Sequence, residues 1–568
     1  MSKLVIIIIK SECFEERQRR MTAISFIIAV VIVSVTILDI IPVTAIVRNY
    51  SLFTTFQRNF KPLHQRSEIK FINRMMSYER FKDIDSYESE AELFESNALN
   101  TIASKALPIQ DSSKMILNVS KSKKVVCIGE ASHGTREFYQ YRNEITKNLI
   151  VHGNCKGVLI EGDFPSVSVC HAYVTNISPN VSIEDCMNSF QRFPTWMWSN
   201  ESFKSFLEWL KEHNSKLLPH QRCGIFGLDL YSFDTSMNAI TSYVKKNDPE
   251  ALPTIKSLYQ CFDRIANCDS QAYGYMTEVL GRTGCQQEFQ RAQEEVKHSI
   301  DRILTSKDPH NTIECETAKA DLALIHSINA QVVIDAEKYY RSMFKSKLRQ
   351  RSDELIVPMS SWELRDTHFF ETLTTILSHL EKTRGPDSTV AVWAHNSHIG
   401  DARYVFAGTR REVELGVSKE LNIGQLVKER FGDDSLLIGQ LTYDGAVTCA
   451  DDWDGPRQSK LVRKGLPGSW EEMLKLVSDK MTTNEFALNL HDDEIRRSVS
   501  QSDRFRLNRC IGVIYRPETE RLSHYFFSDL VHQFDVAVFF RRTSGVIAID
   551  QHPRSVSPIA EELGGLTS

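Results

Sequence analysis

The stretch that most constrains the fold is residues 123–137, where a short apolar run passes directly into polar residues. Residues 125–128 are all apolar, which predicts a β-strand buried on both faces. Glu130 and His133 follow, and apolar residues then recur at the spacing of an α-helix. Ligands of open α/β sheets bind at loops beyond the carboxyl ends of the strands, so these two side chains are placed to act on a ligand.

The same pattern recurs at residues 157–163, where an apolar run ends in Glu161 and Asp163. We expect this strand to lie beside the first one, joined to it by a helix over residues 135–152. A right-handed crossover of this kind makes the two strands parallel and brings their carboxyl ends to one edge of the sheet. Residues 223–230 predict a third strand.

A further strand at residues 389–394 runs into His395 and His398. From residue 236 to about 380 the pattern is helical, which predicts a helical insertion whose last helix carries Arg365 near the next strand. Later strands are predicted at 435–442, 509–515 and 535–540. The fold class is therefore α/β, with a mainly parallel central sheet flanked by helices and a large helical insertion.

The amino-terminal region contains an uncharged stretch, residues 21–38, that meets the threshold of roughly 18 apolar residues for a membrane-spanning helix. Arginines precede it, which predicts a single-pass anchor with the remainder luminal or extracellular. The alternative is a cleaved signal peptide and a secreted protein, because residues 43–45 have the small-residue pattern of a cleavage site. The predicted organisation is a cytoplasmic segment (1–20), the anchor or signal peptide (21–47), a linker (48–90), a catalytic domain (91–552, insertion about 236–380) and a tail (553–568).

The net charge of −5 provides no basic field for nucleic acid, so a small-molecule ligand is expected. The 12 cysteines form no C-x-x-C pair. Cys261, Cys268 and Cys285 fall in one helical region, where an oxidising compartment would allow a disulfide of open pairing. The acidic residues 451–455 resemble half a calcium loop but lack the other liganding positions, which favours a solvated turn.

The polar strand ends together supply a histidine among carboxylates, a combination suited to general base catalysis. His133 would be the base and Glu130 its partner. Arg142, about two turns along the following helix, would bind an anion or polarise a carbonyl. Ser132 is a weak candidate nucleophile, because its surroundings lack the G-x-S-x-G pattern. This set is sufficient for adding water to an ester.

Two alternatives remain open. His395 and His398, with Glu130, Glu161 or Asp163, form a possible ligand set for zinc or a similar ion, although H-x-x-H is a loose pattern. The other alternative is a non-catalytic binding or surface-polymer-associated protein that has kept the pocket.

Four motifs, in this order, resemble the erythromycin esterase family: residues 129–134 (GEASHG), 142–144 (RNE), 161–163 (EGD) and 393–398 (WAHNSH). The resemblance extends roughly from residue 91 to 549. It implies hydrolysis of an ester or macrocyclic lactone by water that a histidine activates, without a serine nucleophile and without a cofactor.

Carried onto this sequence, the resemblance implies that His133 deprotonates water while Arg142 and His395 stabilise the oxyanion. The expected catalytic residues are His133, Glu130, Arg142, Glu161 and His395. The expected substrate contacts are His398, Asp163 and Arg365.

Overall fold

The computed structural model describes residues 84–266, 269–305, 316–345, 360–406 and 420–550. The chain divides into two compact units, residues 1–87 and 88–568, and the account below concerns the second.

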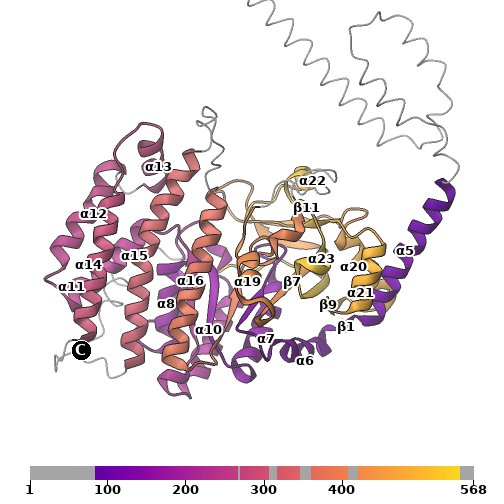
Figure 1. Cartoon of the computed structure of the whole chain (residues 1–568), viewed down its shortest axis with the longest axis horizontal. Helices are drawn as coiled ribbons and strands as arrows, with labels where there is room; N and C mark the ends of the chain where they lie inside the picture. The colour runs from indigo at the N-terminus through magenta and orange to yellow at the C-terminus, as the bar shows by residue number, and fades with distance from the viewer. Residues whose placement is uncertain (1–83, 267–268, 306–315, 346–359, 407–419, 551–568) are drawn as a thin grey trace, which may run out of the picture. The chain divides into compact units, whose positions relative to one another are not determined.

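A nine-stranded sheet forms the centre of this unit (Figure 1). Its strands lie in the order β1 (Leu107–Pro108), β9 (Glu485–Asn489), β12 (Val536–Thr543), β7 (Ser435–Cys449), β2 (Val125–Ile128), β5 (Thr389–Trp393), β3 (Cys155–Asp163) and β4 (Gly224–Asp229), with β8 (Gln458–Val462) paired to β7. The six strands from β12 to β4 are parallel, whereas β9, β1 and β8 are antiparallel to their neighbours. The predicted α/β class with a mainly parallel sheet is confirmed.

The predicted adjacency of the first two strands is wrong, because β5 lies between β2 and β3. Trp393 at the end of β5 is the register partner of Ile128 on one side and of Ile160 on the other. A crossover leaves a gap that a later strand can fill, and local sequence does not reveal which strand fills it. The consequence is that the loop carrying His395 lies between the other two polar strand ends.

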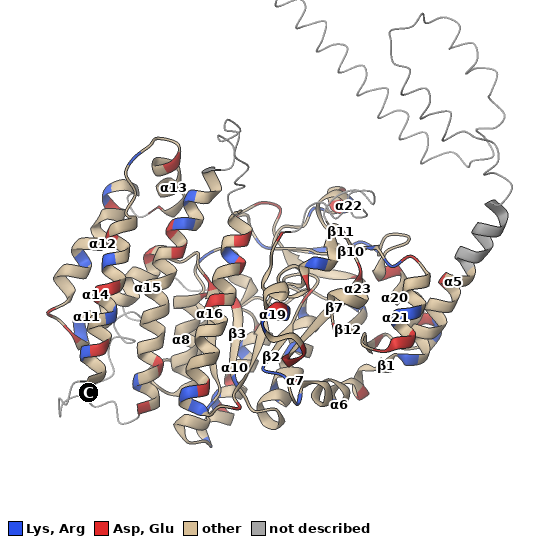
Figure 2. Ribbon diagram, in the orientation of Figure 1, with Lys and Arg blue, Asp and Glu red and all other residues tan. Residues whose placement is uncertain are grey.

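The sheet is buried on both faces, as its apolar runs require. Val126 and Ile128 belong to one core cluster, and Val125 and Cys127 belong to another. The first face is covered by α6 (Ile109–Ser120), α7 (Arg136–His152), α8 (Phe164–Thr175) and α10 (Glu201–Ser215). The second face is covered by α5 (Ile84–Lys105), α16 (Ser361–Arg384), α19 (Ile423–Phe431), α20 (Trp470–Met481) and α21 (Asp493–Gln501). Positively and negatively charged residues are interspersed along the helices (Figure 2).

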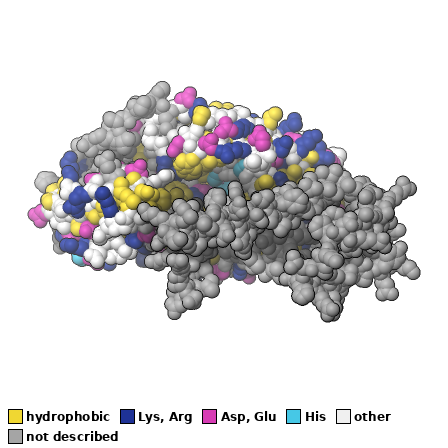
Figure 3. Space-filling model, turned by 90° about the horizontal axis from the view of Figure 1, so that it is seen from above, with side chains coloured by type: hydrophobic (Ala, Val, Ile, Leu, Met, Phe, Trp, Pro, Cys, Tyr) yellow, Lys and Arg dark blue, Asp and Glu magenta, His cyan; other side chains and the backbone are white. Residues whose placement is uncertain are grey.

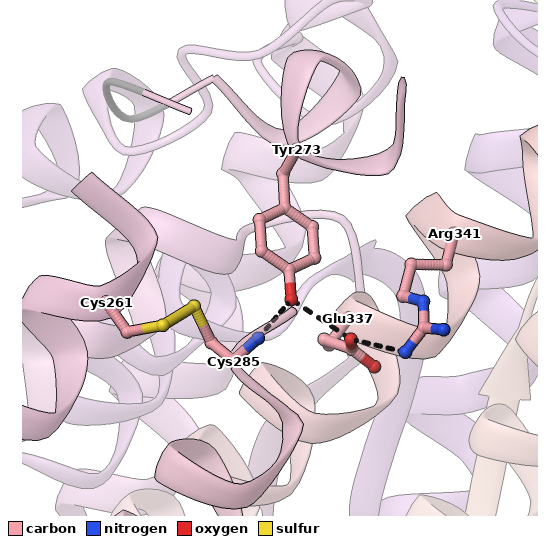
Figure 4. The surroundings of a disulfide bond; sticks show 5 residues. All are labelled: Cys261, Tyr273, Cys285, Glu337 and Arg341. Atoms are coloured by element: carbon pink, nitrogen blue, oxygen red, sulfur yellow. Dashed lines mark hydrogen bonds and ion pairs between the residues drawn. A yellow bond between two sulfur atoms is a disulfide. The ribbon is translucent and has the colours of Figure 1, made fainter. Parts of the chain in front are cut away.

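Between β4 and β5 the described residues form helices and no strand. These helices are α11 (Phe233–Asn247), α12 (Leu252–Ala266), α13 (Ser270–Glu278), α14 (Gln286–Thr305), α15 (Glu316–Lys345) and α16. The first five build a third core cluster, at the left of Figure 1. Within it Cys261 is disulfide-bonded to Cys285, whose backbone N–H donates to the hydroxyl of Tyr273 (Figure 4). Cys268 lies outside the described residues.

The strand predicted at 509–515 is largely wrong. A strand, β10 (Arg506–Arg509), ends where the prediction begins, and it pairs with β11 (Tyr525–Ser528) in a small antiparallel sheet that also contains β6 (Val405–Phe406). From the end of β10 to residue 515 the chain makes only the isolated bridges Ser132–Ile511 and Ala450–Ile514. The segment that contains these apolar residues therefore passes over the loops at the carboxyl edge of the large sheet.

The predicted membrane or secreted location is corrected here. It depended on residues 21–47, which lie outside the described residues. Within the described part of the chain, no helix is both long enough and apolar enough to cross a membrane. The predicted anchor and the location inferred from it are therefore withdrawn.

Candidate active site

A cavity of about 530 Å³ lies at the carboxyl ends of β2, β5, β3 and β4. Six predicted site residues line it, namely His133, Glu161, Asp163, Arg365, His395 and His398. In the space-filling view, histidine side chains are visible near the middle of the face, beside hydrophobic and charged side chains (Figure 3). Glu130 and Arg142 do not line the cavity. The structure thus brings together side chains from three strand ends and from α16.

His133 is held from behind by Glu130, which is completely buried. The Nδ1 atom of His133 lies 2.8 Å from Oε1 of Glu130. Because an ionised carboxylate only accepts hydrogen bonds, Nδ1 carries the proton of the neutral ring, and Nε2 is left as the acceptor. His133 therefore presents a basic nitrogen on the cavity side.

Arg142 lies behind Glu130 and is fully buried, so it does not occupy the position predicted for it beside a substrate carbonyl. Its Nη2 atom is 3.4 Å from Oε2 of Glu130. Its guanidinium carbon lies 4.5, 5.0 and 5.5 Å from the ring centres of Tyr139, Trp393 and Trp198. Helix side chains tilt toward the amino terminus, which carries this one back beneath the loop that bears His133. Arg142 is thus a positioning residue for Glu130.

Glu161 is fixed as an anion. Its Oε2 accepts a 2.8 Å hydrogen bond from the backbone N–H of His395, and its Oε1 accepts a 2.9 Å bond from Nη2 of Arg365. The Nε2 atoms of His398 and His133 lie 3.4 and 3.8 Å from the same Oε1. Burial opposes the charge, but the positively charged His398 and Arg365 hold the pKa of Glu161 well below its usual range.

His395 is a neutral ring with an unused donor. Burial lowers the pKa of His395 to about 3. The backbone N–H of Ser397 donates to its Nδ1 at 3.3 Å, which places the ring proton on Nε2. Nε2 has no hydrogen-bond partner among the described residues, although the Ala131 carbonyl lies near the ring. A buried donor without an acceptor costs about 1–3 kcal/mol, so this N–H is suited to an oxygen that a ligand brings.

His398, three residues further on, is in the opposite state. Its Nδ1 lies 2.9 and 3.0 Å from the two carboxylate oxygens of Asp366. Burial disfavours the charged ring, but Asp366 and Glu161 raise the pKa of His398 to about 9. Arg365, 3.1 Å from Nε2, opposes that charge, and two carboxylates outweigh one cation. His398 is therefore positively charged at neutral pH.

Asp163 and Arg365, both predicted as substrate contacts, line the cavity but are engaged in two-pronged ion pairs. Arg365 donates to both oxygens of Asp229 at 3.1 and 2.7 Å. Asp163 accepts from Nε and Nη2 of Arg192 at 2.8 and 3.0 Å. Sequence reasoning missed Arg192 and Asp366 as site residues. Arg192 follows the short helix α9 (Ile183–Asn188) in an irregular segment that has no periodic signal, whereas Asp366 directly follows Arg365 and was detectable.

The geometry does not assemble the metal-ligand set considered above. In the described ranges, no three His, Cys, Asp and Glu side chains are arranged around one ion position. His398 directs Nδ1 to Asp366 and Nε2 toward Glu161, and its charged ring has no free lone pair for a metal.

Comparison with known proteins agrees with this fold. Residues 150–543 match the family model described as erythromycin esterase. The Bacillus subtilis (strain 168) protein named "Putative hydrolase YbfO" is 21% identical over 367 residues, which cover 64% of this chain and 74% of that protein. The Escherichia coli protein named erythromycin esterase type II is 21% identical over 340 residues, 59% of this chain and 73% of its own.

A solved structure described as a succinoglycan biosynthesis protein aligns with a TM-score of 0.58 at 18% identity, covering 80% of this chain and 98% of its own. At this identity the likeness shows the fold alone. Glu130, His133 and Arg142 precede the residues that match the family model, so their placement rests on the geometry above. The family match nevertheless spans more than half of the sequence, and the chain belongs to the erythromycin esterase family, a family of hydrolases.

Proposed function

We propose that the protein is a carboxylic ester hydrolase that cleaves an ester or lactone of a small molecule with water activated by His133. The observation that carries the proposal is a basic Nε2 on His133, backed by buried Glu130, in the same cavity as the unused N–H of His395. The ring centres of these two histidines are 4.8 Å apart. A base and an electrophilic donor at this separation can act on the two sides of one carbonyl group.

In the reaction, Nε2 of His133 takes a proton from water as the water oxygen bonds to the carbonyl carbon. The carbonyl oxygen gains negative charge, and the Nε2–H of His395 donates to it. The low pKa of His395 keeps its ring neutral. The N–H of a neutral ring can donate a hydrogen bond to the oxyanion without giving up its proton. When the tetrahedral centre collapses, the bond to the alcohol oxygen breaks, and His133 returns its proton to that oxygen.

Two carboxylates then have separate tasks. Glu130 fixes the tautomer of His133 and stabilises the charged ring that forms after proton abstraction, the arrangement that catalytic histidines with a carboxylate partner generally use. Glu161, 3.8 Å from Nε2 of His133, adds negative charge on the cavity side. Its strongly lowered pKa keeps it ionised throughout, so it does not act as a general acid.

The test is hydrolysis of a panel of simple esters, small lactones and macrocyclic lactones by the wild type and by His133→Ala. Macrocyclic lactones are included because one relative is named an erythromycin esterase. Loss of a general base is expected to lower kcat by about 10²–10⁴-fold. His220→Ala, at an exposed histidine outside the cavity, is the control and is expected to retain full activity. Equal turnover by wild type and His133→Ala on every substrate would refute the proposal.

A further inference from the structure

The acidic turn at residues 451–455 is largely exposed to solvent, as expected from sequence, and two of its carboxylates form ion pairs. Asp451 pairs with Lys460, and Asp452 pairs with Arg516. The Nε atom of Arg516 also donates to the carbonyl of Asp451 at 2.9 Å. These contacts link the exposed turn to the segments that carry Lys460 and Arg516.

The turn is also tied to the loop that carries His133. At the end of β7, the backbone N–H of Thr448 donates to the carbonyl of Gly134 at 3.1 Å. Gly134 has φ of +74°, and a Cβ there would lie 2.2 Å from the Thr448 carbonyl oxygen, so only glycine permits this approach. Two residues beyond Thr448, the N–H of Ala450 donates to Val513 at 2.9 Å. The turn therefore has a fixed place relative to the proposed base.

The turn carries Trp453, which lines the cavity and is 51% exposed. Its ring centre is 5.1 Å from that of Phe193, and the two ring planes are inclined at 60°. Phe193 comes from the segment after α9. We call the partly exposed cavity residues Arg192, Phe193 and Trp453 the rim. At the rim, two rings from distant parts of the sequence form a corner that opens to solvent.

Two other aromatic rings of the cavity, those of Trp362 and Tyr231, are already covered by charged groups. Trp362 stacks on His398, with ring centres 4.3 Å apart and planes 10° apart. Tyr231 lies under the guanidinium groups of Arg192 and Arg365, at 4.3 and 4.9 Å. The corner made by Trp453 and Phe193 thus differs from these inner rings in offering apolar surface to a ligand.

We infer that Trp453 and Phe193 form a specificity subsite that holds a ring in the non-reacting part of the substrate. The inference rests on the proposed function for its location beside the reacting ester. A planar ring can stack on one wall of the corner and meet the other wall edge-on, and such aromatic contacts add stabilisation beyond the area that they bury. A linear alkyl chain with the same number of carbons gains only the stabilisation that comes from burying its surface. The subsite therefore favours ring-bearing over linear substrates.

The experiment compares kcat/KM for benzyl acetate and n-heptyl acetate, whose alcohol parts have equal carbon numbers. Trp453→Ala is expected to lower kcat/KM for the benzyl ester about three- to tenfold, mostly through KM, and to change the heptyl ester less than about twofold. Trp453→Phe should retain most of the preference because it keeps a ring. Tyr275→Ala, an exposed aromatic residue outside the cavity, is the control. An equal change for both esters, or no change for either, would overturn the subsite.

A binding measurement tests the subsite independently of whether the protein hydrolyses esters. Benzyl acetate binding is followed by saturation-transfer NMR in His133→Ala and in His133→Ala/Trp453→Ala. If wild type hydrolyses neither ester, weaker binding in the double variant still supports the subsite. Equal binding by the two variants rejects it, whether or not the esters are hydrolysed.

Discussion

The floor of the cavity comprises His133, Glu161, His395 and His398, and it differs from the rim in how its side chains are held. Floor residues are buried and held by one another or by buried Glu130, and Glu161 alone faces three neighbouring donors. Rim residues are partly exposed and rest on ion pairs or on a single ring contact. Charge effects are strong where water is excluded and weak where it enters. The difference supports the proposal that the floor carries out the chemistry and the rim selects the ligand.

The largest effect is expected from breaking the support beneath the floor. In Glu130→Gln the amide can either accept from Nδ1 of His133 without a charge or donate to it and reverse the tautomer. We expect kcat to fall about 10²–10⁴-fold with little change in KM. Steady-state kinetics on the best substrate of the panel measures this. Glu471→Gln removes a charge from another buried glutamate, outside the cavity, and should leave kcat unchanged. A raised KM with normal kcat in Glu130→Gln would contradict the assigned role.

The next effect is expected at the unused donor of His395. His395→Leu, which has no donor, should lower kcat about 10²–10³-fold, the cost of losing one donor to an oxyanion. The matched control is His326→Leu in the helical region, since His326 is also buried and burial lowers its pKa to about 3 as well. Both nitrogens of His326 lack hydrogen-bond partners among the described residues, and it does not line the cavity. If both variants lost activity equally, the effect would be structural and not catalytic.

The floor was largely predictable from sequence and the rim was not, for a physical reason. Each floor histidine or carboxylate follows or ends a short apolar run, and parallel strands bring such ends to one edge. The position of β5 was missed because a crossover of β2 and β3 does not show which strand enters its gap. The complete burial of Arg142 was missed because helical spacing predicts which face of the helix a residue lies on, but not how far that residue is from solvent.

Rim residues belong to irregular segments whose contacts depend on distant pairings. Trp453 lines the cavity, and the adjacent Asp451 and Asp452 pair with Lys460 and Arg516. Nothing in the local pattern indicates those partners. The chemistry of this fold is thus encoded near strand ends, whereas the surroundings of the ligand are encoded in long-range contacts.

A smaller effect, on stability, is expected from Asp366→Asn. The pKa of His398 is about 9 in the folded chain against 6.5 for an ordinary histidine. A raised pKa means that the folded state binds the proton more tightly, so the stabilisation is complete below about pH 6.5 and is lost as the pH rises through about 9. The shift corresponds to about 3 kcal/mol at most.

Asp366→Asn should therefore lower the free energy of unfolding more at pH 6 than at pH 10, as measured by denaturant titration. The same substitution in a His398→Gln background isolates the pair, because no histidine then remains to titrate. In that background the pH dependence of the difference should disappear. If it persisted, another group would be responsible for it.

The smallest effect is expected at the rim, in Arg192→Lys. Lysine keeps the charge but cannot give the two parallel hydrogen bonds that Arg192 makes to Asp163, so the segment bearing Phe193 should be held less firmly. We expect KM to rise about two- to fivefold and kcat to stay within about twofold, because a partly exposed ion pair contributes little energy. Arg302→Lys on α14 is the matched control, since Arg302 also donates through Nε and Nη2 to one carboxylate, that of Asp248, outside the cavity. A fall in kcat as large as that of the floor variants would show that rim and floor act as one unit, and the division of labour between them would then be wrong.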